Sequence, residues 1–319
     1  MQIFRSTAEA IGAFKKTVIT IGNFDGVHLA HQRVIGETRK RAQELSAASM
    51  AITFDPHPIQ VLQPDRTPQF ITPLPYKLEL LAQTGLDAVL LLPFSAEFSQ
   101  TSPMIFCRDY LQRLHALEIH EGKNFHFGHK ATGTVEKLAE YGQELGFAVV
   151  VHPELRVRGD VVSSSRIRQL IREGRMGRTQ RLLGRKFSVR GHIVHGRGLG
   201  HIHTVPTVNL APYQDLLPAN GVYVTRTRIS ERLFNSVTNI GVRPTFGADS
   251  FAVESHLLDY EPMPIEENAA MEITFLYRLR EEKKWPNTEA LKAQIGKDAR
   301  RTKRYFALCQ KSRKAELAK

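Results

Sequence analysis

Two histidines, His28 and His31, lie three positions apart directly after a turn that contains Gly22 and Gly26. At this spacing two side chains share one face of a helix, so both imidazoles would point the same way. Residues 18–21 are apolar or β-branched and too few for a helix, which predicts a buried strand. A strand, a glycine turn and a helix start offer free backbone N–H groups and a positive dipole end to a phosphate. We therefore expect imidazoles that donate to nucleotide phosphates; a strand–helix unit with two surface histidines is the alternative.

A second phosphate motif consists of three consecutive serines at residues 163–165. They precede Ile167, Leu170 and Ile171, whose spacing predicts a helix with the serines at its capped N-terminus. Hydroxyl groups, free backbone amides and two nearby arginines can hold the outer oxygens of a triphosphate. A solvated helix with serine caps and surface arginines is the alternative.

These motifs need elements that position them, and the first half of the chain alternates strands with helices. Strands are expected at residues 18–21, 50–54, 88–92, 117–120 and 148–151, and helices at 31–45, 76–82, 104–114 and 135–145. This alternation predicts a mostly parallel sheet with helices on its faces. Between them, the two prolines of residues 55–58 (DPHP) are expected to exclude helix and form a loop at the carboxyl end of a strand.

From about residue 185 the pattern changes to β-rich segments without intervening helices. They lie at residues 187–194, 205–210, 221–229, 236–240, 252–258 and 271–277, and helical spacing returns over 288–308. Successive strands of this kind predict an antiparallel barrel. We therefore expect two domains, residues 1–184 and 185–319, with a linker near residues 174–186.

The composition agrees with two ordinary globular domains, because 319 residues with 42% apolar content suffice for two cores. No stretch of 18 apolar residues occurs, and the first residues lack the apolar centre of a signal peptide. The two cysteines, Cys107 and Cys309, indicate no disulfide framework. A cytoplasmic protein without a membrane span is expected, and no oligomeric state is indicated.

The net charge of +12 is concentrated in two blocks. Residues 156–197 hold twelve Arg or Lys against two acids, and residues 297–319 hold nine against two. Such blocks favour polyanionic ligands, either nucleotide phosphates or nucleic acid. The sequence has neither zinc-finger spacing nor a basic zipper, so a nucleic-acid-binding regulator is the less favoured alternative.

Seven motifs, taken in order, resemble those of the bifunctional bacterial riboflavin kinase/FAD synthetase family. In the first half they are residues 22–31 (GNFDGVHLAH), 54–58 (FDPHP), 124–128 (NFHFG) and 163–168 (SSSRIR). In the second half they are residues 206–209 (PTVN), 239–246 (NIGVRPTF) and 253–259 (VESHLLD). The resemblance implies an α/β, Rossmann-like nucleotidyltransferase domain with a parallel sheet, then a six-stranded antiparallel β-barrel domain with a C-terminal helix.

For residues 1–184 the resemblance implies an FMN adenylyltransferase. The FMN phosphate attacks the α-phosphorus of ATP, which forms FAD and releases pyrophosphate. By similarity, the nucleotide site comprises His28 and His31 at the ATP phosphates, the turn residues Gly22, Asn23, Phe24 and Asp25, Ser164, Ser165 and Arg168 at the pyrophosphate, and Asn124 at the flavin phosphate. Ala30 stands where the family has glycine, and Ser165 stands where it has threonine.

For residues 185–319 the resemblance implies a riboflavin kinase, in which the ribityl 5′-hydroxyl attacks the γ-phosphate of ATP. Glu254 matches the family's base, and Thr207 and Asn209 match its ligands for Mg²⁺ and ATP, which are hard oxygen donors. Arg280 matches the arginine beside the flavin. Alternation along residues 253–258 does not decide which face carries Glu254.

The family pattern departs most at residues 200–205. There His201, Thr204 and Val205 replace an arginine, a glycine and a phenylalanine. Loss of a permanent cation and a permissive glycine motivates an alternative, in which the adenylyltransferase works and the barrel only binds flavin.

Overall fold

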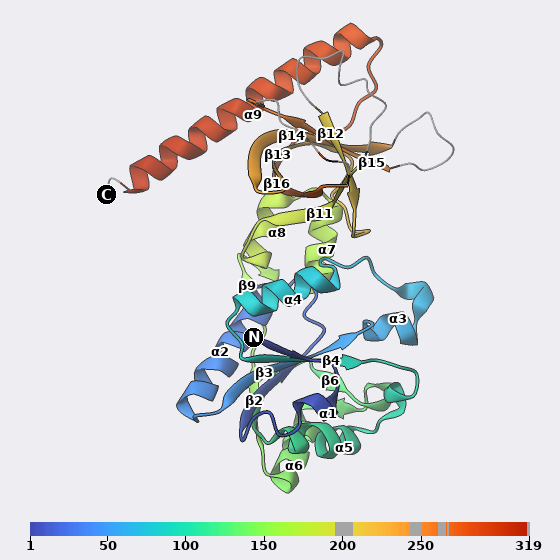
Figure 1. Cartoon of the computed structure of the whole chain (residues 1–319), viewed down its shortest axis with the longest axis vertical. Coiled ribbons are helices and arrows are strands. Elements are labelled where there is room, and N and C mark those ends of the chain that lie inside the picture. The colour runs from blue at the N-terminus through green and yellow to red at the C-terminus, as the bar shows by residue number, and fades with distance from the viewer. Residues whose placement is uncertain (195–206, 243–250, 261–265, 267, 318–319) are drawn as a thin grey trace. The chain divides into compact units, whose positions relative to one another are not determined.

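The computed structural model describes residues 1–194, 207–242, 251–260, 266 and 268–317. The chain divides into two compact units, Met1–Arg166 and Ile167–Lys319. Figure 1 shows a sheet with helices in the first unit, and a barrel and a long helix in the second. This division falls earlier than residue 184, and a functional boundary at residue 184 stays a prediction.

The first unit is built on a six-stranded parallel sheet with the strand order β1-β4-β3-β2-β5-β8. Its strands are β1 (Gln2–Phe4), β2 (Thr17–Ile21), β3 (Ala48–Asp55), β4 (Ala88–Pro93), β5 (Ala116–Gly122) and β8 (Ala148–His152). The predicted parallel sheet is thereby confirmed. Strand β2 lies between β3 and β5, so the connections diverge there and leave a switch point, where open α/β sheets bind ligands.

Helices cover both faces of this sheet. They are α1 (Thr7–Ala10), α2 (Leu29–Glu44), α3 (Pro58–Leu62), α4 (Leu74–Gln83), α5 (Pro103–Phe106) and α6 (Val135–Leu145). On one face Ile19 and Met50 pack with Phe106 and Leu138. On the other, alternate strand residues such as Ala51 pack with residues of α2 and α4. The alternation of side chains along each strand thus supplies two apolar layers.

Shorter elements complete the first unit. These are the pairs β6 (His126–Phe127) with β7 (Gly133–Thr134) and β9 (Arg156–Val157) with β10 (Asp160–Val161), a π-helical segment η3 (Cys107–Leu111), and 3-10 turns η1 (Pro64–Arg66), η2 (Phe98–Gln100), η4 (Gln112–Leu114) and η5 (His129–Ala131). The expectation that residues 55–58 exclude helix was wrong at its last residue, because α3 begins at Pro58 with His57 as its N-cap. Proline is compatible with the first turn of a helix, where its missing N–H has no partner to lose.

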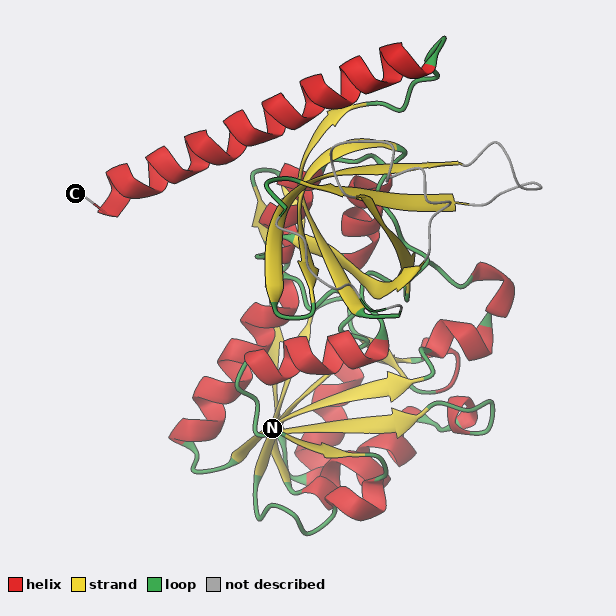
Figure 2. Ribbon diagram, turned by 45° about the horizontal axis from the view of Figure 1, so that its top comes forward, coloured by secondary structure: helices red, strands yellow, loops and turns green. Residues whose placement is uncertain are grey.

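The second unit is a closed barrel with the strand order β11-β12-β15-β14-β13-β16 (Figure 2). Its strands are β11 (Phe187–Val194), β12 (Thr207–Pro212), β13 (Gly221–Ile229), β14 (Arg232–Val242), β15 (Phe251–Leu257) and β16 (Ala270–Arg280). All neighbouring strands are antiparallel, which confirms the predicted six-stranded barrel. Helices α7 (Ser164–Arg172) and α8 (Met176–Leu183) precede it, and α9 (Thr288–Leu317) follows it.

The interior of the barrel holds a cluster of hydroxyl groups. Thr225 contacts Ser236 and Thr238 at 2.8 and 2.7 Å, and Thr227 contacts Ser236 and Ser255 at 2.8 and 2.7 Å. All five residues are fully buried. Because each hydroxyl both donates and accepts, the cluster satisfies itself without charge.

One segment is more ordered than the sequence suggested. Most of the predicted linker at residues 174–186 is helix α8, which buries Met176, Leu182 and Leu183. The basic side chains there occupy the outer face of an amphipathic helix, so the charge concealed the helical spacing.

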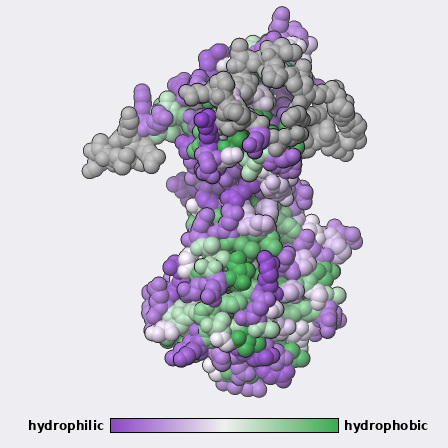
Figure 3. All heavy atoms as spheres, viewed as in Figure 1, coloured by the Kyte–Doolittle hydropathy of each residue, from purple (hydrophilic) through white to green (hydrophobic). Residues whose placement is uncertain are grey.

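Figure 3 shows hydrophilic side chains over most of the visible face and hydrophobic ones gathered on the first unit. In the described part of the chain, no helix combines the length and apolar character needed to cross a membrane.

Candidate active sites

The turn after β2 has an unusual backbone. Phe24 and Val27 have φ angles of 47° and 38°, and Gly26 between them has 84°. Only glycine adopts such angles at no steric cost, and a Cβ on Gly26 would lie 3.0 Å from Ile71 Cδ1. Phe24 and Val27, buried in the core, are therefore strained residues held by their surroundings.

The buried carboxylate of Asp25 anchors this turn. Its Oδ1 accepts hydrogen bonds from the backbone N–H groups of Ile71 and Thr72 at 3.0 and 3.1 Å. The hydroxyl of Thr72 in turn accepts from the N–H of Gly26 at 3.1 Å. Asp25 was predicted as a nucleotide-binding residue; its described contacts make it the anchor of the loop that would bind the nucleotide.

His28 is the N-cap of α2, and its Nδ1 accepts the backbone N–H of His31 at 3.4 Å. A ring nitrogen that accepts carries no proton, so the ring proton of His28 lies on Nε2. The two rings stack at 3.6 Å with 16° between their planes, and the Phe24 ring meets His31 edge-on at 5.2 Å. The predicted convergence of both imidazoles at a helix N-terminus is therefore present in the structure.

Positive charge lies under the same turn. Lys77 of α4 is buried, and its Nζ lies 3.3 Å from both the carbonyl oxygen of Asn23 and the hydroxyl of Thr53. Burial lowers the pKa of Lys77, an effect opposed by Asp25 and Asp55. Burial, with the charges of His28 and Lys77, also holds the pKa of His31 well below its usual value. His31 is thus neutral at neutral pH.

A cleft of about 280 Å³ opens at the switch point between β2 and β5. Gly22, Phe24, His31 and Asn124 line it, all of them predicted site residues. The remaining lining residues are Thr20, Ile21, Ala30, Arg33, Val34, Glu121, Gly122, Lys123, Phe125, His152, Pro153, Glu154, Leu155, Val161, Val162 and Ser163. The structure therefore gathers residues from five separate stretches of sequence around one cavity.

Glu121 explains why β2 and β5 separate there. The ladder between the two strands ends at Ile19 and Ile119, and the next free N–H, on Ile21, donates to the Glu121 carboxyl instead. This side chain is 4% exposed, and burial raises its pKa well above the usual value. A buried neutral carboxyl thus replaces a main-chain acceptor and keeps the strands apart.

The serine motif also lies at the turn. Ser163 caps α7 through the N–H of Arg166 at 3.3 Å, and the hydroxyl of Ser164 donates to the carbonyl of Asp25 at 3.0 Å. Ser165 is exposed in the first turn of α7, and Arg168 lies one turn beyond Ser164. The first unit therefore brings Ser164 together with the glycine turn, across more than a hundred residues of sequence.

The candidate kinase residues lie on neighbouring strands of the barrel. Asn209 of β12 is directly opposite Glu254 of β15, which is in turn opposite Asn239 of β14. We call Asn209, Glu254 and Asn239 the Glu254 row. Glu254 and Asn239 are partly exposed, whereas Ser255 is fully buried among the interior hydroxyls. Glu254 and Asn239 therefore lie on the outer face of the barrel, and Asn209, which is paired with Glu254 on that face, is buried there.

Two further predicted residues differ in their relation to this row. The hydroxyl of Thr207, opposite His256, contacts His256 Nδ1 at 2.7 Å, two pairs along the same two strands. Arg280 lies at the end of β16, opposite Val222, and its guanidinium binds the buried carboxylate of Asp298 at 2.9 Å. Thr207 thus lies on the same two strands as Asn209 and Glu254, whereas the Arg280 side chain binds a residue of α9. The altered stretch at residues 200–205 lies outside the described residues.

Sequence reasoning missed several of these residues. Lys77 was part of an expected helix, and nothing local marks it as buried under the turn. Glu118, His120 and Glu121 are polar residues in and directly after the stretch 117–120, which was predicted as a strand of a parallel sheet. Such strands are normally apolar throughout, so this departure was the available signal.

Comparison with known proteins gives the class of each unit. A family model described as FAD synthetase matches residues 11–166, and one described as riboflavin kinase matches residues 183–306. Over 95% of this chain, the fold matches a crystal structure described as a macrolide-efflux protein from Streptococcus pneumoniae, with a TM-score of 0.82 and 26% identity. The shared fold covers 98% of that chain. The two family models thus define an enzyme with a nucleotidyltransferase domain and a kinase domain.

Two curated relatives identify the family. A bifunctional riboflavin kinase/FMN adenylyltransferase from Listeria monocytogenes is 33% identical over 91% of this chain and 92% of its own. The one from Haemophilus influenzae is 30% identical over 96% and 99%. The chain belongs to the bifunctional riboflavin kinase/FMN adenylyltransferase family, which confirms the resemblance noted from its motifs.

Proposed function

We propose that this enzyme phosphorylates riboflavin to FMN at the Glu254 row and adenylylates FMN to FAD at the cleft beside His31. Family membership supports the two reactions. The observation that carries the adenylylation site is the stack of His28 and His31 at the N-terminus of α2, with Ser164 bonded to the same turn. This arrangement offers imidazole donors, a helix dipole and hydroxyls to one polyphosphate.

In the adenylylation step, the FMN phosphate attacks the α-phosphorus of ATP, and the bond to the departing pyrophosphate breaks. His28 donates from Nε2 to phosphoryl oxygens, and Lys77 adds positive charge beneath the turn. Ser164, Ser165 and Arg168 hold the pyrophosphate, and Asn124 orients the flavin phosphate. Positioning and stabilisation of developing charge supply the rate, because no covalent intermediate is required.

In the kinase step, Glu254 takes the proton of the ribityl 5′-hydroxyl as that oxygen attacks the γ-phosphate of ATP, and the bond from the γ-phosphorus to the departing ADP breaks. Glu254 suits this role because it lies on the outer face of the barrel, opposite Asn209, where a substrate can reach it. Arg280 was predicted to lie beside the flavin. Because its guanidinium binds Asp298, the structure supports this role for Arg280 less than it supports the roles of Glu254, Thr207 and Asn209.

Mg²⁺ is the metal expected for both reactions. Among the described residues no group of three or more His, Cys, Asp or Glu could hold a metal ion. Mg²⁺ usually takes one or two protein oxygens and completes its shell with phosphates and water. The hydroxyl of Thr207 and the amide oxygen of Asn209 would hold it in the barrel. When bound, it neutralises charge on the transferred phosphoryl group.

Incubation with riboflavin, ATP and Mg²⁺, followed by chromatography of the flavins, tests the proposal. We expect riboflavin to disappear while FMN and then FAD appear. Conversion of FMN to FAD without any FMN from riboflavin would leave the barrel as a flavin-binding domain only. Steeply salt-dependent binding of nucleic acid, with no flavin turnover, would favour the regulator instead. A cytoplasmic location stays a prediction from the sequence.

A further inference from the structure

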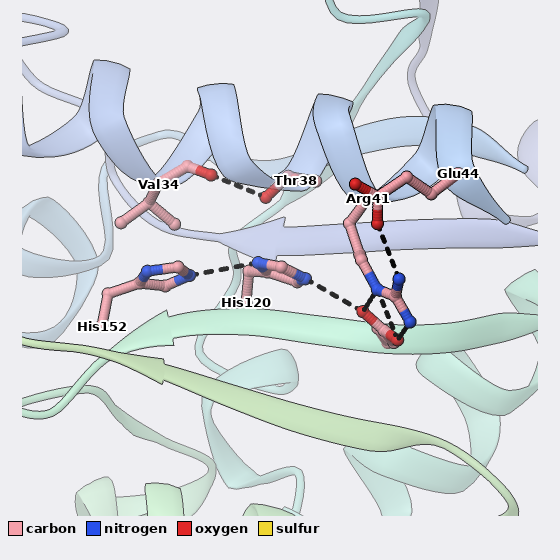
Figure 4. A network of polar contacts seen from close by, with 7 residues as sticks. Val34, Thr38, Arg41, Glu44, His120 and His152 are labelled. Atoms are coloured by element: carbon pink, nitrogen blue, oxygen red, sulfur yellow. Dashed lines mark hydrogen bonds and ion pairs between the residues drawn. The ribbon is translucent and has the colours of Figure 1, made fainter.

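A chain of four polar side chains crosses the first unit and ends at the cleft (Figure 4). Arg41 of α2 bonds both carboxylate oxygens of Glu118 on β5, through Nε at 3.0 Å to each and Nη2 at 2.9 Å to Oε1. Glu118 Oε2 lies 3.3 Å from His120 Nε2, and His120 Nδ1 lies 3.1 Å from Nε2 of His152. His152 is the last residue of β8 and lines the cleft. None of these contacts is used by the proposed mechanism.

The chain fixes the protons on both imidazoles. Arg41 lowers the pKa of Glu118, so this carboxylate is ionised and can only accept. His120 therefore carries its proton on Nε2 and donates to Glu118. In a neutral imidazole the other nitrogen is then an acceptor, so His152 Nε2–H donates to His120 Nδ1. His152 is left with an unprotonated Nδ1.

If the two histidines were protonated, both nitrogens of each ring would carry a proton and neither ring could accept a hydrogen bond. The surroundings disfavour protonation. Burial lowers the pKa of both His120 and His152. Arg41 on α2 acts in the same direction on His120, and Arg33 on His152. Glu37 on α2 raises the pKa of both rings and Glu118 raises that of His120, but burial is the largest effect at each ring. Both rings are therefore neutral at neutral pH, with one tautomer each.

We propose that His152 Nδ1 accepts a hydrogen bond from a donor on the adenosine half of ATP, with Arg41, Glu118 and His120 as positioning residues that fix its tautomer. The proposal rests on the proposed adenylylation at this cleft. Figure 4 shows that the second nitrogen of His152 points away from His120. A lone pair there repels phosphate oxygens, and the nearby lining includes the apolar Val34, Leu155 and Val162. These features suit a nucleoside, whose donors are the 6-amino group and the ribose hydroxyls.

Nucleotide analogues that each lack one hydrogen-bond donor of adenosine test this contact. We would measure kcat/KM for FAD formation with ATP, with inosine triphosphate (which lacks the 6-amino donor) and with 2′-deoxyATP, in the wild type and in His152→Leu. The wild type should prefer ATP over at least one analogue, and His152→Leu should reduce that preference about tenfold, the effect of one ordinary hydrogen bond. The analogue affected identifies the donor. Ratios within about twofold of wild type for both analogues would overturn the proposal.

Calorimetric binding of the same three nucleotides separates this inference from the proposed reaction. A wild type that forms no FAD would contradict the adenylylation, while a binding preference lost in His152→Leu would still support the His152 contact. Equal binding preferences in both proteins would contradict the contact even if FAD formation were normal.

The positioning chain has its own test, with a matched control. In Glu118→Gln, the amide oxygen would stay with Arg41 and its NH₂ would donate to His120, which reverses both tautomers and leaves a donor at His152 Nδ1. We expect the preference for ATP to be lost. Glu44→Gln alters another carboxylate bonded to Arg41, at 2.7 Å, but outside the chain to His120, and should keep the preference. Equal preferences in the two variants would overturn the positioning role.

Nitrogen chemical shifts of the unaltered protein test the tautomer without any variant that could fail to fold. Long-range ¹H–¹⁵N spectra should show His152 protonated at Nε2 and unprotonated at Nδ1. A proton on Nδ1 in the free protein would refute the assignment.

Discussion

The two candidate sites are assembled by different means. In the first unit, residues from the turn after β2, the end of β5 and the start of α7 meet at one edge of a parallel sheet. In the second, the Glu254 row consists of positions directly opposite one another on paired antiparallel strands. The first site therefore depends on loop conformation and on the anchor Asp25. The second depends on strand register, which every hydrogen bond of the ladder reinforces.

The difference has a practical lesson. A site made by loops can be changed by a substitution far away that releases an anchor, whereas a site made by register resists such changes. Buried ionisable groups follow the same division, because Lys77 and Glu121 lie at the loop site. The described residues of the two sites share no structural element, so a variant at one site should change one reaction and leave the other unchanged. The variants below test this independence.

The largest effect should come from removing one site entirely. A fragment of residues 1–184 should convert FMN to FAD and leave riboflavin unchanged, as shown by chromatography of the flavins. It keeps α7 and α8 complete, whereas a fragment ending at residue 166, where the compact unit ends, cuts α7 and lacks Arg168. A folded 1–184 fragment that does not use FMN would show that the activities are not separable there.

Glu254→Gln should be next in size. It keeps the shape of the side chain and removes the base, so FMN formation should fall about 10²–10⁴-fold while riboflavin still binds. The rate of FAD formation from FMN is the internal control. Kinase turnover within a few-fold of wild type would exclude Glu254 as the base.

His28→Ala and His31→Ala, made separately, should each slow FAD formation on the order of 10²–10³-fold, the range for losing a donor to developing charge. FMN formation from riboflavin should be unaffected. If both reactions fell equally in a folded variant, the assignment of these imidazoles to one site would be wrong.

The smallest effect concerns Glu121 and stability rather than turnover. Its raised pKa means that the folded protein keeps a proton that the unfolded chain releases above about pH 4.5, so wild-type stability declines as pH rises from there. Glu121→Gln has no such proton but keeps an acceptor for the Ile21 N–H. Denaturant unfolding should show a stability gain over wild type that grows with pH.

Glu121→Leu is the matched comparison, because it leaves the N–H of Ile21 buried without an acceptor. Because neither variant titrates at this position, Glu121→Leu should be about 1–3 kcal/mol less stable than Glu121→Gln at every pH. A gain for Glu121→Gln that does not change with pH would contradict the neutral carboxyl.

Much of the fold followed from local pattern. Helix α6 and strands β11 and β13 lie at the residues predicted from spacing alone, because their periodicity is strong and their ends carry turn residues. The face of Glu254 was not predictable, since the interior of the barrel is lined there by Ser255 and other hydroxyls rather than by apolar residues. Alternation along β15 therefore gave no contrast.

Site residues that depend on the order of strands were also beyond the sequence. His120 and His152 are far apart in the chain and meet only because β5 and β8 are neighbours with residue 120 opposite residue 150. Lys77 reaches the turn only because α4 packs beside α2 on one face of the sheet. The histidines of α2, in contrast, are positioned by helix geometry, and their sequence spacing was enough.

The backbone angles of Phe24 and Val27 have a consequence for how this enzyme can change over generations. Each costs on the order of 1–3 kcal/mol in the folded protein, whether or not a nucleotide is bound. Glycine at position 27 would relieve the angle but would also remove a buried side chain from the core, and the loss offsets the gain. The turn that we propose for FAD synthesis therefore offers little gain in heat tolerance. A lineage that needs both properties must gain its heat tolerance elsewhere, in α9 or in the barrel.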